Sequence, residues 1–391
     1  MSEIKVNSIK GVGASVAAIS IDNANGSCTA NITNNLSNRN LIINGAMQIA
    51  QRGSSGVADA GYHTVDRIIY TGTGFDENPT QSQSDVASGT TPYTLGFRKA
   101  FKVTNGNQTS GAGAADELGV RYSIEAQDVA NSGWNYTSTS SFITLSFWVK
   151  SSVAQNFYAY LRTKDGTSYI YPFETGALSA DTWTKVTKTI PGNSNITIDN
   201  NTGEGFTIEW RLFAGTNFTN SGVSLNTWAA FASGTRTPDS TSTWYTTNDA
   251  TFEITGVQLE VGSVATDFEH RSYAQELSLA KRYYQQINGD SGDNTGFPAY
   301  SESTTSMRVP IQLHPAMRTA FTLSKSGTFR FQGATNDSDD SAASFSLEGV
   351  NTSFNGCTIR NVHYANMGAA DRPGNLEFRQ DGSSLKFDAE L

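Results

Sequence analysis

The sequence has little charge, almost no cysteine and no long apolar run. Lysine, arginine, aspartate and glutamate make up 16% of the 391 residues, against roughly 25% in average soluble proteins. The two cysteines, Cys28 and Cys357, lie near opposite ends of the chain. We expect unpaired thiols rather than a disulfide framework or a metal cluster, although a disulfide between the two stays open. Because no run of about 18 apolar residues is present, we expect no membrane-spanning segment.

The charge balance also argues against two classes of binding partner. A net charge of −9 argues against nucleic-acid backbones and anionic membranes, because both attract basic patches. The first residues, MSEIKVNSIKGVGASVAAISI, lack the uninterrupted apolar core of a signal peptide. We therefore expect no membrane insertion and no export by the ordinary route. The Ser-, Thr-, Asn- and Gly-rich composition is nevertheless typical of extracellular use, as in a virion component made in a host cytoplasm and released by lysis.

The pattern of apolar and polar residues predicts a mainly β protein in four parts. Residues 1–40 carry short apolar pieces that cannot form a core alone, so we expect an anchoring or stalk segment that orders against another chain, with a disordered tail as the alternative. Residues 41–270 predict an antiparallel β-sandwich, most simply a jelly roll. Residues 271–288 predict one connecting helix, and residues 289–391 a C-terminal β domain.

Two-residue periodicity supports the sandwich. In FTIEWRLFAG (206–215) the apolar side chains alternate with polar ones and share one face. In FITLSFWVKSS, Trp148 makes the second face partly apolar too, which predicts a central strand covered on both sides. In FEITGVQLEVG the alternation switches at Gly256, as at a β-bulge. Glu253 and Glu260 then lie on the same, solvated side.

The period changes after Phe268. Ser272 followed by Gln275 and Glu276 predicts a capped helix of roughly four turns, which stops at Asn288-Gly289. Beyond it, MRVPIQLH, TAFTLS, GTFRFQG and NLEFRQDGSSLKFDAEL predict strands, the last with a hairpin turn at QDGSS.

Several of these segments together resemble phage tail-fibre and related virion structural proteins of cyanophages, other marine phages and prophages. They are NLIINGAMQIAQRGSS, YHTVDRI, LSFWVKSS, WTKVTKTIPG, FTIEWRLFAG and, most specifically, ITGVQLEVGSVATDFEHRSYAQELSLAKRYY. The resemblance covers roughly residues 41–285; the first 40 residues are similar, more weakly, to the anchoring heads of cyanophage fibres. It implies a homotrimeric, non-enzymatic adhesin with a carbohydrate-binding-like jelly roll. It also implies attachment to a phage tail or adaptor protein through residues 1–40.

Aromatic side chains opposite the core face are the candidate glycan site, because the C–H faces of sugars stack on aromatic rings. One platform would comprise Tyr158, Tyr160, Tyr169 and Tyr171 with Arg162 alongside, and a second Trp244 and Tyr245 in a Ser/Thr-rich loop. The alternative is that these rings pack against another layer or a sister subunit. Three weak sites on a trimer would bind a host cell-surface polysaccharide by avidity.

Acidic residues offer two catalytic alternatives. Asp267, Glu269 and His270 suit a general base or a metal pair, but a strand-to-helix joint explains them better, since no GxSxG, HExxH or reactive cysteine accompanies them. Paired carboxylates could make a polysaccharide depolymerase, with the candidates Glu209, Glu253 and Glu260. Their mixing with basic residues is typical of a solvated sheet face, so we expect no enzyme. A purely structural role, as a capsid decoration or tail spacer, is the other alternative.

Two acidic loops could hold calcium, which prefers several oxygens from one loop. They are GDSGDN, with Asp290, Asp293 and Asn294, and NDSDDS, with Asp337, Asp339 and Asp340. Neither has EF-hand spacing, so we expect simple polar turns, no metal and no cofactor.

Overall fold

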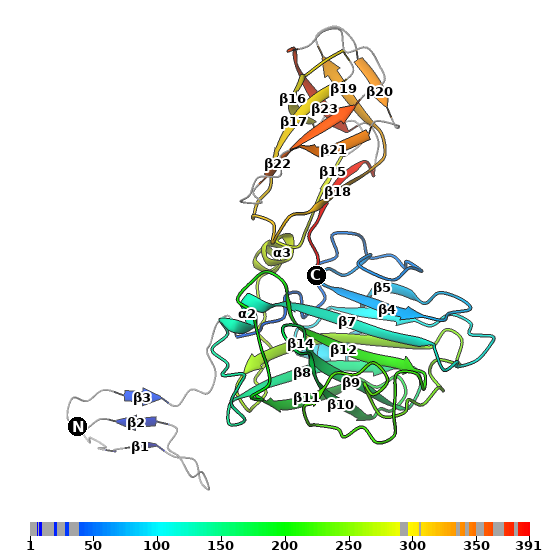
Figure 1. Ribbon diagram of the computed structural model, residues 1–391, viewed down its shortest axis with the longest axis vertical. Helices are drawn as coiled ribbons and strands as arrows, with labels where there is room; N and C mark the ends of the chain where they lie inside the picture. Colours follow the sequence, from blue (N-terminus) through cyan, green and yellow to red (C-terminus); the bar gives the residue numbers. More distant parts are fainter. Residues whose placement is uncertain are drawn as a thin grey trace.

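The computed structural model describes residue 6 and residues 8–9, 19–21, 28–30, 39–289, 296–304, 306–333, 337–340, 344–348, 356–362, 371–378 and 382–391. Within these residues the protein is mainly β, as predicted, with antiparallel strands in five sheets and three short helices (Figure 1). None of the helices in the described part of the chain is long and apolar enough to cross a membrane.

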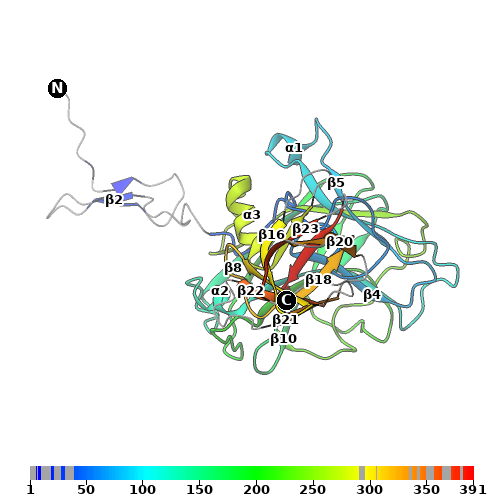
Figure 2. The ribbon, with the colours of Figure 1, turned by 90° about the horizontal axis from the view of Figure 1, so that it is seen from above.

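A small antiparallel sheet lies at the N-terminal end. It consists of β1 (Ser8–Ile9), β2 (Ile19–Ile21) and β3 (Cys28–Ala30), and Figures 1 and 2 place it to one side of the larger sheets. Val6 and Ile9 are exposed there. Strands of two or three residues are too short to bury their apolar side chains alone. That the segment orders against another chain stays a prediction.

Two antiparallel sheets packed face to face form the predicted sandwich. The six-stranded sheet has the order β13-β10-β9-β12-β7-β4 and the five-stranded sheet the order β11-β8-β14-β6-β5. The strands are β4 (Ile68–Thr73), β5 (Thr80–Asp85), β6 (Lys99–Thr104), β7 (Glu117–Glu125), β8 (Phe142–Ser151), β9 (Asn156–Thr163), β10 (Tyr169–Ala177), β11 (Thr184–Pro191), β12 (Glu204–Ala214), β13 (Ala229–Ala230) and β14 (Thr251–Val261). Two short helices, α1 (Thr91–Thr94) and α2 (Ala126–Ala130), interrupt the connections. The chain crosses repeatedly from one sheet to the other, as in a jelly roll.

The core between the sheets is built by the predicted alternation. Phe206, Ile208, Trp210 and Leu212 of β12 are at most 1% exposed and belong to one apolar cluster with Phe147 of β8. The outward side chains of these strands are also largely buried, so other parts of the chain cover the sheets. What covers each sheet therefore decides where a ligand can bind.

The predicted bulge in β14 is confirmed. The register with β8 shifts between Thr255 and Gln258, and Gly256 has a φ of 61°. Such a conformation is costly for any residue with a Cβ atom. The expectation that Glu253 and Glu260 are solvated is wrong, because these side chains are 7% and 1% exposed and both bind polar neighbours.

The connecting helix is shorter than the predicted 271–288. Ser272 caps α3 (Tyr273–Lys281) as expected, but the next residues form strand β15 (Tyr284–Asn288). Each residue of β15 pairs with β24 (Ser384–Asp388). Backbone hydrogen bonds to a strand about 100 residues away thus replace those of the last helical turns.

The residues after α3 fasten the two β regions together. The guanidinium of Arg67 lies 3.4 Å from the ring centre of Tyr283, and that of Arg52 lies 3.5 Å from the ring centre of Tyr284. Both arginines pair with Glu390 near the C-terminal end. A desolvated cation–π contact is worth up to about 2 kcal/mol. The paired tyrosines therefore belong to a buried junction between the sandwich and the C-terminal region.

Two further sheets make the C-terminal region. The three-stranded sheet has the order β15-β24-β18, and the seven-stranded sheet the order β20-β19-β23-β16-β17-β22-β21. The remaining strands are β16 (Gly296–Ser301), β17 (Ser306–Gln312), β18 (Thr322–Ser326), β19 (Phe329–Gly333), β20 (Asp337–Asp340), β21 (Ser344–Glu348), β22 (Gly356–Val362) and β23 (Pro373–Phe378). Cys357 of β22 is a buried free thiol, and burial raises its pKa to about 11.

Two predictions for this region are wrong. The segment containing QDGSS does not join a hairpin, because β23 and β24 belong to different sheets. Residues 337–340 form strand β20 rather than a loop, and an extended strand cannot wrap successive oxygens around one calcium ion. The other acidic candidate, with Asp290, Asp293 and Asn294, lies outside the described residues.

Candidate functional site

The predicted tyrosine platform is divided between the two sides of the six-stranded sheet. Tyr158, Tyr160 and Arg162 of β9 share its outer face, as predicted. Tyr169 and Tyr171 of β10 point to the opposite side, because Ile170 is the residue aligned with Arg162. Tyr171 is 3% exposed within the core cluster. These five residues therefore do not form one platform.

The outer face of this sheet carries a buried polar network instead. The Tyr160 hydroxyl donates to Glu209 Oε2 at 2.5 Å, and Arg211 binds Glu209 at 3.2 Å and Glu117 at 2.5 Å. Burial, together with the Glu209 carboxylate, raises the pKa of Tyr160 well above its usual value. Burial opposes the charge of Arg211, but Tyr160 and the two carboxylates raise its pKa overall. The network is structural and leaves Tyr160 1% exposed.

The 215–240 loop covers part of the same face. Phe231 lies against Arg162, with 3.4 Å between the guanidinium carbon and the ring centre, and Phe218 lies 4.6 Å from Arg236. Arg236 in turn binds Glu117 at 2.7 Å. Arg162 is thus already stacked on an aromatic ring of this chain.

The second predicted platform is wrong. Trp244 and Tyr245 are both 0% exposed. The Trp244 indole donates to the carbonyl of Thr251 at 3.0 Å, and the Tyr245 ring stacks on Phe213 at 4.5 Å. These two side chains belong to the core although the loop around them is polar, and they therefore cannot contact a sugar.

An accessible aromatic pocket lies on the outer face of the five-stranded sheet, in a place that sequence reasoning missed. Its volume is about 250 Å³. The floor comes from β8 and the β14 bulge, one wall from the α1–β6 connection, a second wall from the segment after β14, and the rim from β11. The lining residues are Leu95, Phe97, Ser146, Trp148, Lys185, Gly256, Thr266, Asp267, Phe268 and His270. We refer to it as the Trp148 pocket.

The bulge and the chain after it shape this pocket. A Cβ atom at Gly256 would lie 2.7 Å from the Phe97 ring and 3.1 Å from the Trp148 ring, so glycine leaves room for both. Beyond the bulge, Gln258 accepts the N–H of Glu269 at 2.8 Å. Strand β14 thus holds the segment that forms the second wall.

The two walls meet in an aromatic cluster. The Phe97 and Phe268 rings lie 4.9 Å apart, and each lies close to His270, at 5.3 and 4.9 Å between ring centres. His270 Nε2 lies 2.9 Å from the carbonyl oxygen of Leu95. The walls are therefore joined to each other as well as to the sheet.

The lining combines ring faces with hydrogen-bonding groups. Trp148 is 9% exposed, whereas Lys185 and Asp267 are exposed at the rim. Within the described residues, the Lys185 ammonium and the Asp267 carboxylate have no ion-pair partner. Charged donors and acceptors bind neutral hydroxyls more strongly than neutral groups do. An apolar ring beside such groups suits a sugar, which has a C–H face and a hydroxyl rim.

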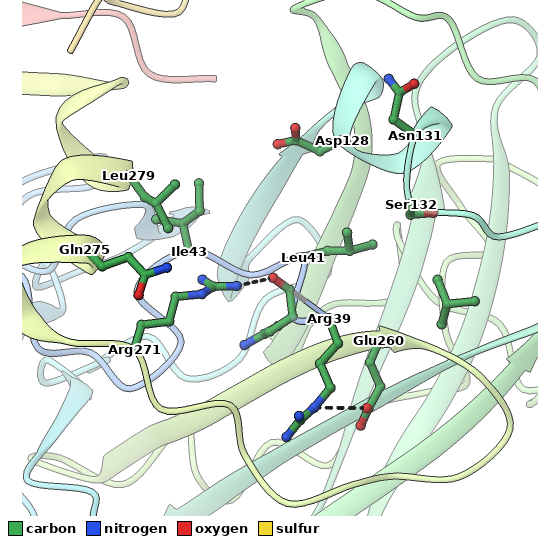
Figure 3. A pocket seen from close by; sticks show the side chains of 12 residues that line it. Arg39, Leu41, Ile43, Asp128, Asn131, Ser132, Glu260, Arg271, Gln275 and Leu279 are labelled. Atoms are coloured by element: carbon green, nitrogen blue, oxygen red, sulfur yellow. Dashed lines mark hydrogen bonds and ion pairs between the residues drawn. The ribbon is translucent and has the colours of Figure 1, made fainter. Parts of the chain in front are cut away.

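A larger pocket, of about 470 Å³, lies where residue 39 leads into the sandwich (Figure 3). Arg39 Nε lies 3.7 Å from Glu260 Oε2, and Arg271 donates to the carbonyl of Asn40 at 2.5 Å. None of its lining residues is aromatic. Its arginines bind this chain's own carboxylate and backbone, as expected of a joint that anchors the base of the N-terminal segment.

The charged cluster at Asp267–Arg271 belongs partly to this joint. Glu269 Oε2 accepts the N–H of Asn40 at 2.8 Å and lies 3.3 Å from Arg271, so the predicted structural role is confirmed for Glu269. Asp267 and His270 instead line the Trp148 pocket. In the described parts of the chain, no three His, Cys, Asp or Glu side chains gather as a metal site requires.

The three candidate carboxylates are dispersed. Glu209 lies on the six-stranded sheet, whereas Glu253 and Glu260 lie on β14 of the other sheet. Seven positions along a strand span roughly 20 Å, beyond the roughly 5–9.5 Å between the carboxyl groups of a glycosidase pair. Any pair among these three is therefore too far apart or lies on different sheets.

No protein-family model and no curated protein matches the sequence. Among solved structures, the bacteriophage CBA120 tailspike protein 4 enzymatically active domain is similar at 11% identity and a TM-score of 0.29, over 57% of this chain but 21% of that chain. The family 11 carbohydrate-binding module of a Clostridium thermocellum cellulosomal cellulase is similar at 12% identity and a TM-score of 0.25, over 56% of this chain and 99% of that chain. Identities and scores this low say nothing about what this chain binds.

Proposed function

We propose that this protein is a non-catalytic glycan-binding adhesin of a phage virion, a tail-fibre or receptor-binding protein that attaches the particle to host cell-surface polysaccharide. The Trp148 pocket carries the glycan-binding part of the proposal, because an indole that lines a pocket beside a charged donor and a charged acceptor is suited to a hydroxylated ring. The virion part rests on the resemblance of residues 41–285 to phage fibre proteins.

Multivalency supplies the affinity in this proposal. A single shallow pocket binds one sugar weakly, whereas three linked pockets gain avidity without new contacts. Residues 1–40 join the copies into a homotrimer and attach it to a phage tail or adaptor protein. The small β1–β3 sheet supports this arrangement, because Ile9 of β1 and the preceding Val6 are exposed and lack a covering surface among the described residues.

A glycan array probed with the full chain tests the binding proposal. We expect binding to some host-type polysaccharides, a loss of at least about tenfold in Trp148→Ala, and a smaller loss in Lys185→Ala. Stacking contacts of about 0.5–1.5 kcal/mol, together with lost hydrogen bonds, give this range. Tyr158→Ala, on the outer face of the other sheet, is the matched control. Equal binding by Trp148→Ala and the wild type contradicts the assignment of the site.

Two assays separate the adhesin from its alternatives. Pre-incubating host cells with the isolated protein is expected to reduce phage adsorption; no reduction, with no array binding, favours a structural spacer. New reducing ends after incubation with host polysaccharide indicate a depolymerase instead. Light scattering tests the trimer, and a monomer at micromolar concentration with residues 1–40 intact contradicts it.

A further inference from the structure

A second tryptophan lies beside the Trp148 pocket on the same sheet face. Trp183 directly precedes β11, whose Lys185 lies opposite Trp148 of β8. Because side chains alternate along a strand, Trp183 points to the same outer face as Lys185. Trp183 is half-buried and packs against the cluster that contains Trp148. The face therefore offers a second ring, one step nearer the edge of the sheet.

Polar groups also accompany this second ring. Lys150 Nζ lies 5.2 Å from the Trp183 ring centre and 2.9 Å from Glu253 Oε1. Glu253 is held on its other side by the Ser84 hydroxyl, at 3.3 Å. An ion pair fixed beside an indole offers both donors and an acceptor to hydroxyl groups. The surroundings of Trp183 thus repeat, in a shallower form, the chemistry of the Trp148 pocket.

The opposite side of the pocket is closed. Across the sheet order β11-β8-β14-β6, the aromatic cluster of Phe97, Phe268 and His270 stands on the β14 and β6 side. The contact between His270 and the Leu95 carbonyl joins this wall to the α1–β6 connection. A chain that runs across the sheet meets the wall after the Trp148 pocket. On the other side, Lys185 belongs to β11, the edge strand of this sheet.

We propose that this face binds the end of a hexose chain through two subsites, with the terminal hexopyranose in the Trp148 pocket and the next residue on Trp183. The remainder of the chain leaves over β11. This inference rests on the proposed glycan-binding function and adds the number of sugar residues that are bound and the direction in which the chain leaves. It makes Trp183 and Lys150 binding residues.

Calorimetric titration of the full chain tests the two subsites. The probes are hexo-oligosaccharides of one to four residues built from glucose, galactose or mannose. For the sugar that binds, affinity is expected to rise about three- to tenfold from one residue to two and to change little after that. Trp183→Ala is expected to abolish this rise and to leave monosaccharide binding unchanged, whereas Trp183→Phe keeps part of it. Trp148→Ala weakens binding at every length.

A bulky fluorophore on either end of the bound disaccharide tests the closed wall. Only one of the two labelled disaccharides is expected to bind, because the other places its label against Phe97 and Phe268. Binding of both, or an affinity that keeps rising through four residues, overturns the chain-end arrangement. An unchanged rise in Trp183→Ala overturns the second subsite. If no probe binds the wild type although the full chain binds polysaccharides on the array, this inference fails and the proposed function stands; if the array shows no binding either, both fail.

Discussion

The two outer faces of the sandwich differ in what covers their outward-facing side chains. Each sheet turns polar and aromatic side chains outward. On the six-stranded sheet, Tyr160, Glu209 and Arg211 bind one another beneath the 215–240 loop. On the five-stranded sheet, the two walls border Trp148 and leave a pocket of about 250 Å³.

The difference shows that an outward-facing aromatic residue is not by itself a binding surface. Tyr160 satisfied the sequence criterion for a sugar platform, yet its hydroxyl already binds Glu209 and its ring is 1% exposed. Trp148 was expected to be covered and is only 9% exposed, yet it lines a pocket. Changes on the first face should therefore alter stability without altering binding, and changes on the second should mainly alter binding.

The largest expected effect comes from removing the central cation of the buried network. Arg211→Ala leaves the carboxylates of Glu209 and Glu117 without this partner, which should lower the free energy of unfolding by about 3–5 kcal/mol. Urea denaturation measures this change. Glycan binding at a temperature where the variant stays folded should equal that of the wild type. A loss below about 1 kcal/mol, typical of a surface pair, would break the comparison by placing this network in solvent.

The bulge glycine comes next, because it affects both properties of the open face. Gly256→Ala forces a Cβ atom into a left-handed conformation and against Phe97, at a cost of about 2–4 kcal/mol, and should also weaken glycan binding. Gly133→Ala is the matched control, since Gly133 has a φ of 84° and no atom within 4 Å of an added Cβ. The Gly133→Ala control should lose stability through backbone strain alone and should bind glycan as the wild type does. Equal behaviour of the two variants in both assays would contradict the role of the bulge in shaping the pocket.

A smaller effect is expected from one hydroxyl of the covered face. Tyr160→Phe removes the donor to Glu209 and should cost about 1–2 kcal/mol of unfolding free energy. Thermal denaturation of the variant beside Tyr158→Phe, whose hydroxyl is more accessible, isolates the contribution of this hydrogen bond. Weaker glycan binding by Tyr160→Phe would move the binding site back to the six-stranded sheet.

The smallest change in stability is expected at the pocket rim. Lys185→Ala should stay within about 0.5 kcal/mol of the wild type while lowering glycan affinity about three- to tenfold. Lys188→Ala is the control, because Lys188 lies on the same strand with the opposite facing. Calorimetric titration of both variants measures the difference in glycan affinity. An equal loss of affinity in the two would show that binding depends on overall charge and not on the position of Lys185.

Local patterns predicted much of the fold. Alternation located the strands from β8 to β12, the parity switch located the bulge at Gly256, and the spacing of Ser272 located the start of α3. Each depends on neighbours in sequence. The end of α3 was predicted wrongly because β15 forms by pairing with β24, which no local pattern reveals.

The site was less predictable for the same reason. One signal was present, since Trp148 stands on the more polar side of its strand, and the ITGVQLEVG…RYY block supplies much of its surroundings. Because that block was interpreted only as a catalytic site or a structural joint, the contribution of Phe268 and His270 to a wall of the Trp148 pocket was missed. The block in fact contributes the bulge, the wall, the cap of α3 and the tyrosines of the buried junction.

By itself, the sequence determined that this chain is mainly β, which side of most sandwich strands faces the core, and where one strand bulges. These properties follow from side-chain periodicity and backbone conformation, which act over a few residues. Only the tertiary structure decided that Trp244 and Tyr245 are buried, that the Tyr160 hydroxyl binds Glu209, and that Trp148 lines a pocket. Exposure depends on what distant segments place above a residue, and such contacts leave no mark in the local pattern.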